Sequence, residues 1–136
     1  MKKLFLIDAY ALIFRFYYAF IGRPMRNADG VNTSAVFGFV RYINEIIRRE
    51  NPHYLGVAFD PPGGNFRHEL FADYKANRGE TPEDIIVSVP YIKEFLEAMR
   101  IPVIEVPGYE ADDVIVTLSR EAAEAGFEVF MVTPDK

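Results

Sequence analysis

The chain opens with the stretch Lys3-Leu4-Phe5-Leu6-Ile7-Asp8, an apolar run that ends at a carboxylate. Three further runs rich in β-branched and aromatic residues lie at 54–60, 101–106 and 128–133. Nearly continuous apolar runs of this length are typical of strands that are covered on both faces, as in a parallel sheet. Segments with helical periodicity lie between them. The alternation predicts an α/β fold with a mostly parallel central sheet flanked by helices.

Three of the intervening segments have clear helical signals. Apolar residues recur at helical spacing over 36–47. A second helix is expected over about 81–99, where Pro90 should cause a kink or a break. A third is expected over 110–124, because Gly126 suits the residue that follows a helix end.

Composition excludes several classes of protein. With 136 residues, of which 50% are hydrophobic and 26% charged, the chain has the size and balance of one globular domain or part of one. The absence of cysteine excludes disulfides, thiolate metal sites and cysteine nucleophiles. No apolar stretch approaches the ~20 residues needed to span a bilayer. We therefore expect a cytoplasmic protein with no membrane partner.

Acidic residues follow every predicted strand. Asp8 ends the first run and Asp60 ends the second. Three acids follow the third run after a short turn at 107–109, and one follows the fourth; these are Glu110, Asp112, Asp113 and Asp135. Because parallel strands all finish at the same edge of a sheet, these carboxylates should converge there, where open α/β folds place their sites. Glu110 and Asp113 should share one helix face, with Asp112 about 100° around the helix from its neighbour.

Carboxylates gathered in this way repel one another, which raises their pKa values unless something compensates. Hard divalent cations such as Mg²⁺ or Mn²⁺ prefer oxygen ligands, and this sequence offers no thiolate or histidine-rich set for zinc. Two such ions about 4 Å apart can activate a water and stabilise the leaving oxygen of a phosphodiester. Taken singly, each acid could instead be a turn residue, a helix cap or a partner of a helix dipole. Their repetition after every strand favours a metal site.

The net charge of −5 does not argue against a polyanionic substrate. Without the six acids of the predicted site, the rest of the chain would carry +1. The irregular segment 61–80 contains Arg67, Lys75 and Arg78, with Tyr74 between them. Cations beside aromatic rings suit single-stranded nucleic acid, although this segment taken alone favours solvated surface charges.

The motifs in their order resemble the 5′ nuclease domain of bacterial DNA polymerase I, which belongs to the flap-endonuclease group. The resemblance is carried by Leu6-Ile7-Asp8, Phe14-Arg15, Phe59-Asp60, Phe66-Arg67, Tyr74-Lys75-Ala76-Asn77-Arg78, Gly108-Tyr109-Glu110-Ala111-Asp112-Asp113 and Thr133-Pro134-Asp135-Lys136. It implies a PIN-like fold and a 5′-3′ exonuclease or flap endonuclease. Such an enzyme hydrolyses phosphodiesters at 5′ ends, nicks or flaps of DNA in replication and repair.

The resemblance also implies roles for individual residues. Metal-ligand positions, direct or through water, would be Asp8, Asp60, Glu110, Asp112 and Asp135, with Asp113 as a neighbouring acid. The complete domain would hold two Mg²⁺ or Mn²⁺ ions. Lys75 and Arg78 would be catalytic basic residues of an arch formed by 61–80. Phe14, Arg15, Arg67 and Tyr74 would contact the DNA, and we expect a monomer.

In this family another aspartate would follow Asp135-Lys136, where the sequence stops. We therefore expect residues 1–136 to be the N-terminal part of a longer 5′-3′ exonuclease domain, weak or inactive by itself. A non-catalytic DNA-binding fragment is one alternative. A receiver-like phosphoacceptor module is another, although such modules carry an acidic pair after the first strand and Asp8 is followed by Ala9-Tyr10.

Overall fold

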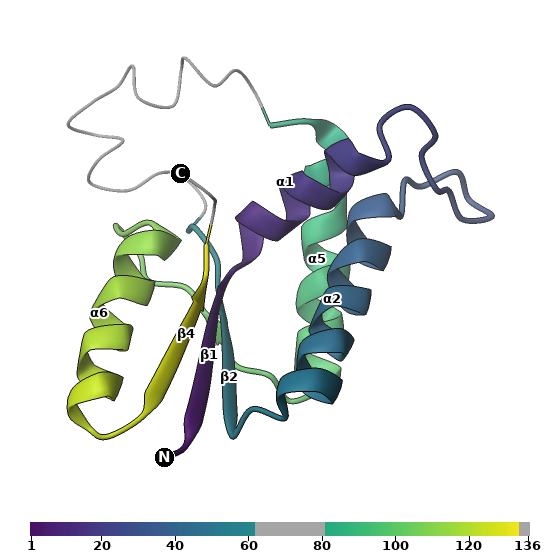
Figure 1. Cartoon of the computed structure of the whole chain (residues 1–136). Helices are drawn as coiled ribbons and strands as arrows, with labels where there is room; N and C mark the ends of the chain where they lie inside the picture. Colours follow the sequence, from purple (N-terminus) through teal and green to yellow (C-terminus); the bar gives the residue numbers. More distant parts are fainter. Residues whose placement is uncertain (62–80, 134–136) are drawn as a thin grey trace.

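The computed structural model describes residues 1–61 and 81–133. Within them, four strands form one parallel sheet in the order β3-β2-β1-β4 (Figure 1). The strands are β1 (Lys3–Asp8), β2 (Tyr54–Ala58), β3 (Val103–Ile104) and β4 (Glu128–Val132). The predicted α/β fold with a parallel central sheet is confirmed.

Helices cover the two faces of the sheet unequally. They are α1 (Ala9–Ala19), α2 (Ser34–Glu50), α5 (Glu83–Ala98) and α6 (Ala111–Glu124). The first three lie on one face and α6 lies on the other (Figure 1). Side chains alternate along β1, so Phe5 and Ile7 join the large core under α1, α2 and α5, whereas Leu6 joins a small core under α6.

The central strands match the expectation from sequence better than the outer ones. The buried residues at the ends of β1 and β2 lie in the middle of the sheet. In contrast, β3 is paired over two residues only, and its Val103 is exposed, so the prediction of a strand over 101–106 was too long. Pro102 and Pro107 flank this edge strand and have no N–H to donate to a ladder. The half-exposed β4 also contradicts burial on both faces.

The helix boundaries lie close to those predicted. The third predicted helix corresponds to α6, and Gly126 follows it with a φ of +93°. Of the kink or break predicted at Pro90, the break is wrong, because α5 runs through this position. Proline cannot donate to the carbonyl four residues earlier, at Ile86. The side chain of Ile86 is half exposed, so that carbonyl lies on the side of the helix that water can reach.

No helix in the described ranges is long and apolar enough to cross a membrane.

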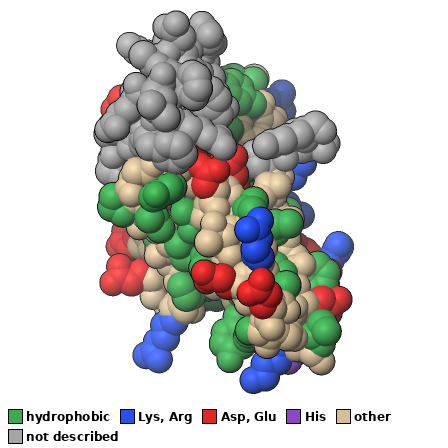
Figure 2. Space-filling model, turned by 90° about the vertical axis from the view of Figure 1, so that its left-hand side faces the viewer, with side chains coloured by type: hydrophobic (Ala, Val, Ile, Leu, Met, Phe, Trp, Pro, Cys, Tyr) green, Lys and Arg blue, Asp and Glu red, His purple; other side chains and the backbone are tan. Residues whose placement is uncertain are grey.

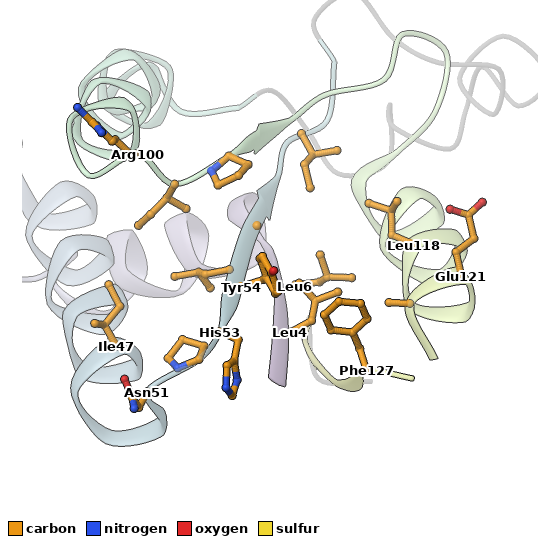
Figure 3. A pocket seen from close by; sticks show the side chains of 17 residues that line it. Leu4, Leu6, Ile47, Asn51, His53, Tyr54, Arg100, Leu118, Glu121 and Phe127 are labelled. Carbon is orange, nitrogen blue, oxygen red and sulfur yellow. The ribbon is translucent and has the colours of Figure 1, made fainter. Parts of the chain in front are cut away.

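The face of the sheet that α6 alone covers has a hollow of about 730 Å³ between the second half of α6 and the start of β2 (Figure 3). Leu4, Tyr54, Leu118 and Phe127 are among its lining residues. The hollow therefore lies toward the end of the sheet where the strands begin, away from the edge at which open α/β folds bind ligands.

Candidate metal centre

Asp8 is the last residue of β1 and stands directly before α1. Its side chain is buried, and Oδ1 accepts a hydrogen bond from the Ala11 N–H at 3.3 Å, which caps the helix. Burial raises the pKa of Asp8 from 3.8 to about 6, against the lowering effect of the Ala11 hydrogen bond. The nearby carboxylates of Asp60 and Asp112 contribute to the same rise. Asp8 therefore both caps α1 and belongs to a cluster of acidic side chains.

Asp60 follows β2 and connects that strand to the start of α6. Its Oδ1 accepts a hydrogen bond from the N–H of Ala111, the first residue of α6, at 2.7 Å. The preceding Phe59 donates its N–H to the carbonyl of Ile104 at 2.8 Å. Asp60 therefore lies at a helix N-terminus, where the helix dipole favours a negative charge.

The acids at the start of α6 lie together. Carboxylate oxygens of Glu110, Asp112 and Asp113, one from each residue, lie within 4.8 Å of one another. Asp112 was expected about 100° away from its neighbour on the helix. Glu110, however, is the N-cap with an extended backbone (φ −75°, ψ 156°), so helical spacing does not fix its direction. Figure 2 shows acidic side chains grouped on the α6 side of the molecule, near the end where the strands finish.

These three residues fit a divalent cation. Ligand oxygens of an octahedral Mg²⁺ are about 3 Å apart when adjacent and about 4 Å apart when opposite, so the three carboxylates would move closer together to bind one ion directly. Within residues 1–61 and 81–133, Oδ1 of Asp112 is buried and has no hydrogen-bond partner. A buried carboxylate oxygen without a donor is costly, and a cation would offset that cost. The possible metal ligands are all carboxylates, which hard ions such as Mg²⁺ and Mn²⁺ prefer.

The structure places the remaining candidate residues differently. Phe14 lies on α1, half-buried, with its ring centroid 6.4 Å from that of Tyr10 and 6.3 Å from that of Tyr18. It packs against the large core. Arg15 is exposed on the same helix. The other candidates lie outside the described residues; these are Arg67, Tyr74, Lys75, Arg78 and Asp135.

Residues 3–136 match the family model of the 5′-3′ exonuclease, N-terminal resolvase-like domain. The chain belongs to this family. It is 40% identical over 136 residues to a 5′-3′ exonuclease of Aquifex aeolicus, covering 100% of the chain and 46% of that relative. It is 42% identical over 136 residues to DNA polymerase I of Bacillus caldotenax, covering 99% of the chain and 15% of the polymerase. The chain thus spans about half of the first relative and a small part of the second.

Solved structures share the fold of this family member. The T5 5′-exonuclease with bound divalent zinc ions aligns with a TM-score of 0.69 and 22% identity, over 98% of this chain and 49% of that one. A T5 flap endonuclease in a pseudo-enzyme–product complex with DNA and metal ions aligns with a TM-score of 0.62 and 20% identity. That alignment covers 98% of this chain and 49% of the other. At this level of identity, the alignments show the shared fold.

The sequence predictions did not include a group of side chains that lies near Asp60 and Phe59. Tyr10, Lys93 and Glu105 meet there from α1, α5 and the segment after β3. Burial raises the pKa of Tyr10, and the nearby carboxylates of Asp60 and Glu105 raise it further. The position of Tyr10, two residues after Asp8, is the single weak signal that the sequence offers. Lys93 and Glu105 belong to separate elements and share no spacing that a periodic pattern could reveal.

Proposed function

We propose that this chain provides the metal-binding part of a 5′-3′ exonuclease or flap endonuclease that hydrolyses phosphodiesters at 5′ ends, nicks or flaps of DNA. The observation that carries the proposal is the convergence of Glu110, Asp112 and Asp113 within 4.8 Å, beside a buried and unsatisfied oxygen of Asp112. Family membership supports the same reaction class. The T5 flap endonuclease, with DNA and metal ions in its complex, supports the same partners.

In this proposal each described carboxylate has a position fixed by the fold. Glu110, Asp112 and Asp113 hold a Mg²⁺ or Mn²⁺ ion together with Asp8 and Asp60. A bound ion would supply activation of a water and stabilisation of the charge that develops on the phosphodiester. Asp8 is held by the Ala11 N–H and Asp60 by the Ala111 N–H, so neither has to be ordered when the ion arrives. Such preorganisation reduces the entropic cost of binding.

The residues outside the described ranges keep their proposed roles. Asp135 would contribute to a second ion, Lys75 and Arg78 would act on the scissile phosphate, and Arg67 and Tyr74 would contact the DNA strand. Phe14 and Arg15 would meet the DNA from α1, where the exposed guanidinium of Arg15 is accessible to a phosphate.

Metal titration tests the proposal directly. We expect the wild-type chain to bind Mn²⁺ in isothermal titration calorimetry, and Asp112→Asn to weaken the affinity at least tenfold, because it removes one charged ligand. Asp29→Asn, in an exposed loop, is the matched control and should bind as the wild type does. Equal affinities for the Asp112 variant and the wild type would contradict the metal site.

Cleavage of a 5′-labelled flap oligonucleotide tests the reaction. Because the chain covers 46% of the Aquifex aeolicus relative, we expect slow Mg²⁺-dependent cutting that stops when the ion is chelated. Flap binding without cutting would favour the alternative of a non-catalytic DNA-binding fragment. Fast cutting by residues 1–136 would contradict the expectation that this part alone is weak. Membership of the exonuclease family argues against the receiver-like alternative.

A further inference from the structure

Phe59, the residue directly before Asp60, lies in an unusual environment for a strand end. Its side chain is fully buried. The ring of Tyr10, from α1, meets it edge-on with centroids 5.9 Å apart and planes at 85°. Lys93 Nζ, from α5, lies 4.9 Å from the Phe59 centroid, within the range of a cation–π interaction. Two helices therefore contact the same ring next to a candidate metal ligand.

Glu105 connects this ring to a third element. Its Oε1 lies 2.9 Å from Lys93 Nζ, which forms a hydrogen-bonded ion pair. Glu105 directly follows Ile104, whose carbonyl accepts the Phe59 N–H at 2.8 Å. Lys93 thus contacts both the ring and the acid on either side of this backbone hydrogen bond. Loosening Lys93 would remove this contact of α5 with the ends of β2 and β3 at the residue before Asp60.

From this geometry we propose that Lys93 and Glu105, with Tyr10, are positioning residues that hold the Asp60 carboxylate against the start of α6. The inference rests on the proposed function in one respect, namely that the position of Asp60 matters for cation binding. The side chains of Lys93 and Glu105 are 37% and 30% exposed, and Lys93 Nζ lies 2.9 Å from Glu105 Oε1, compared with 3.7 Å between Lys3 Nζ and Glu50 Oε1. The shorter distance strengthens the attraction between the two charges.

Charge and position must be separated, because removing the lysine alone would make the site more negative and would by itself favour a cation. Replacing both members of the pair, Lys93→Gln with Glu105→Gln, leaves the net charge unchanged. Lys3 offers a matched control at the opposite end of the sheet. Its Nζ lies 3.7 Å from Glu50 Oε1 and 5.9 Å from the Phe130 ring centroid, so Lys3→Gln with Glu50→Gln removes the same kinds of contact.

The Ala111 amide reports the position of Asp60 without any metal, because its N–H donates to Asp60 Oδ1 at 2.7 Å. We expect the Lys93/Glu105 double variant to speed hydrogen exchange at Ala111 and to weaken Mn²⁺ affinity about tenfold. Lys93→Arg alone should leave the Ala111 exchange rate and the Mn²⁺ affinity as in the wild type, since arginine keeps the positive charge and a hydrogen-bond donor. The Lys3/Glu50 control should change neither. Glu105→Gln alone, a milder change, should speed hydrogen exchange at Ala111 by less than the double variant does.

The outcomes separate this inference from the proposed function. If the wild type binds no Mn²⁺ but exchange at Ala111 still rises in the double variant, the positioning role stands and the metal site fails. If the wild type binds Mn²⁺ and the double variant retains both its affinity and its Ala111 protection, the positioning role is overturned. Weakened affinity with unchanged Ala111 protection would also overturn it, because the effect would not act through Asp60.

Discussion

The two ends of the sheet handle charge in opposite ways. Where the strands finish, the carboxylates of Asp8, Asp60 and Asp112 lie close enough to raise the pKa of Asp8, which is buried. Where the strands begin, the charged groups are paired and accessible to water: Lys3 faces Glu50 at 3.7 Å, with side chains 34% and 45% exposed. The first end carries an electrostatic cost in the absence of a cation, and the second carries almost none.

The sheet topology explains why this electrostatic cost lies where the strands finish. In a parallel sheet the helices that follow each strand begin at the edge where the strands finish, so α1 and α6 direct their N-terminal amides toward the carboxylates. These amides make the acids tolerable, but they do not neutralise like charges packed together. The remaining repulsion is a cost that a cation at the proposed metal site would offset.

The largest expected difference between the two ends concerns metal affinity. Asp60→Asn should lower Mn²⁺ affinity by roughly 10–100-fold, because it removes a charge from the cluster while keeping an acceptor for the Ala111 N–H. Glu50→Gln, the equivalent change at the other end, should leave the affinity within about twofold, because solvent screens a charge at that distance. Calorimetric titration of both variants measures this difference, and equal effects would remove the distinction between the ends.

The second largest difference between the two ends should lie in their contributions to the pH dependence of folding stability. The folded chain holds the Asp8 proton more tightly than the unfolded chain does, because burial and neighbouring acids raise its pKa from 3.8 to about 6. Protonated Asp8 therefore stabilises the fold, fully below about pH 4, and this contribution is lost as pH rises through about 6. The full shift corresponds to at most about 3 kcal/mol.

Urea unfolding of the metal-free chain between pH 4 and 8 measures that loss. Asp8→Asn should flatten the profile while retaining a cap for α1, and Asp29→Asn should leave the profile unchanged. Added Mn²⁺ should raise the stability of the wild type at pH 8 but not that of Asp8→Asn to the same extent. A wild-type slope retained in the Asp8 variant would assign the pH dependence to other groups.

A pair of glycines at the two ends of α6 offers a comparison of intermediate size. Gly108 and Gly126 have φ of +89° and +93°, and no atom lies within 4 Å of a Cβ added at either. Alanine at each position should cost about 1–2 kcal/mol of unfolding free energy through backbone strain alone. Gly108→Ala should also weaken Mn²⁺ binding, because it lies two residues before Glu110, whereas Gly126→Ala should not. Identical metal affinities in the two variants would mean that the turn before α6 does not position the acids.

The smallest effect is expected from the paired charges where the strands begin. The coupling energy between Lys3 and Glu50 should be below about 1 kcal/mol, since exposed ion pairs contribute little. A double-mutant cycle with Lys3→Gln and Glu50→Gln, followed by urea unfolding at low and high salt, measures it. A larger, salt-resistant coupling would show that this end of the sheet is not screened by solvent.

The sequence predicts well the end of the sheet where the strands finish, because two simple rules act there. Apolar runs that finish at Asp8 and Asp60 mark the central strands, and parallel topology brings their ends together. The same rules fail for β3, where Pro102 and Pro107 limit pairing at the sheet edge. Apolar character alone does not reveal that limit.

The finer geometry of the site depends on features that periodicity does not encode. Glu110 joins Asp112 because its backbone is extended before the helix begins, which a helical projection cannot anticipate. Lys93 reaches Phe59 and Glu105 through the packing of α5 against the sheet, so contacts between distant segments determine it. The predictions for residues 62–80 and 134–136 lie outside the described part of the chain.

The amide contacts of Asp8 and Asp60 have a practical consequence for anyone who wants an inactive protein. Each of these side chains supports the first turn of a helix through one oxygen, at Ala11 and Ala111 respectively. Alanine at either position would remove helix support together with charge, so a loss of activity could reflect a damaged fold. Asparagine keeps the oxygen and removes the charge, which makes it the better choice for testing the proposed metal site.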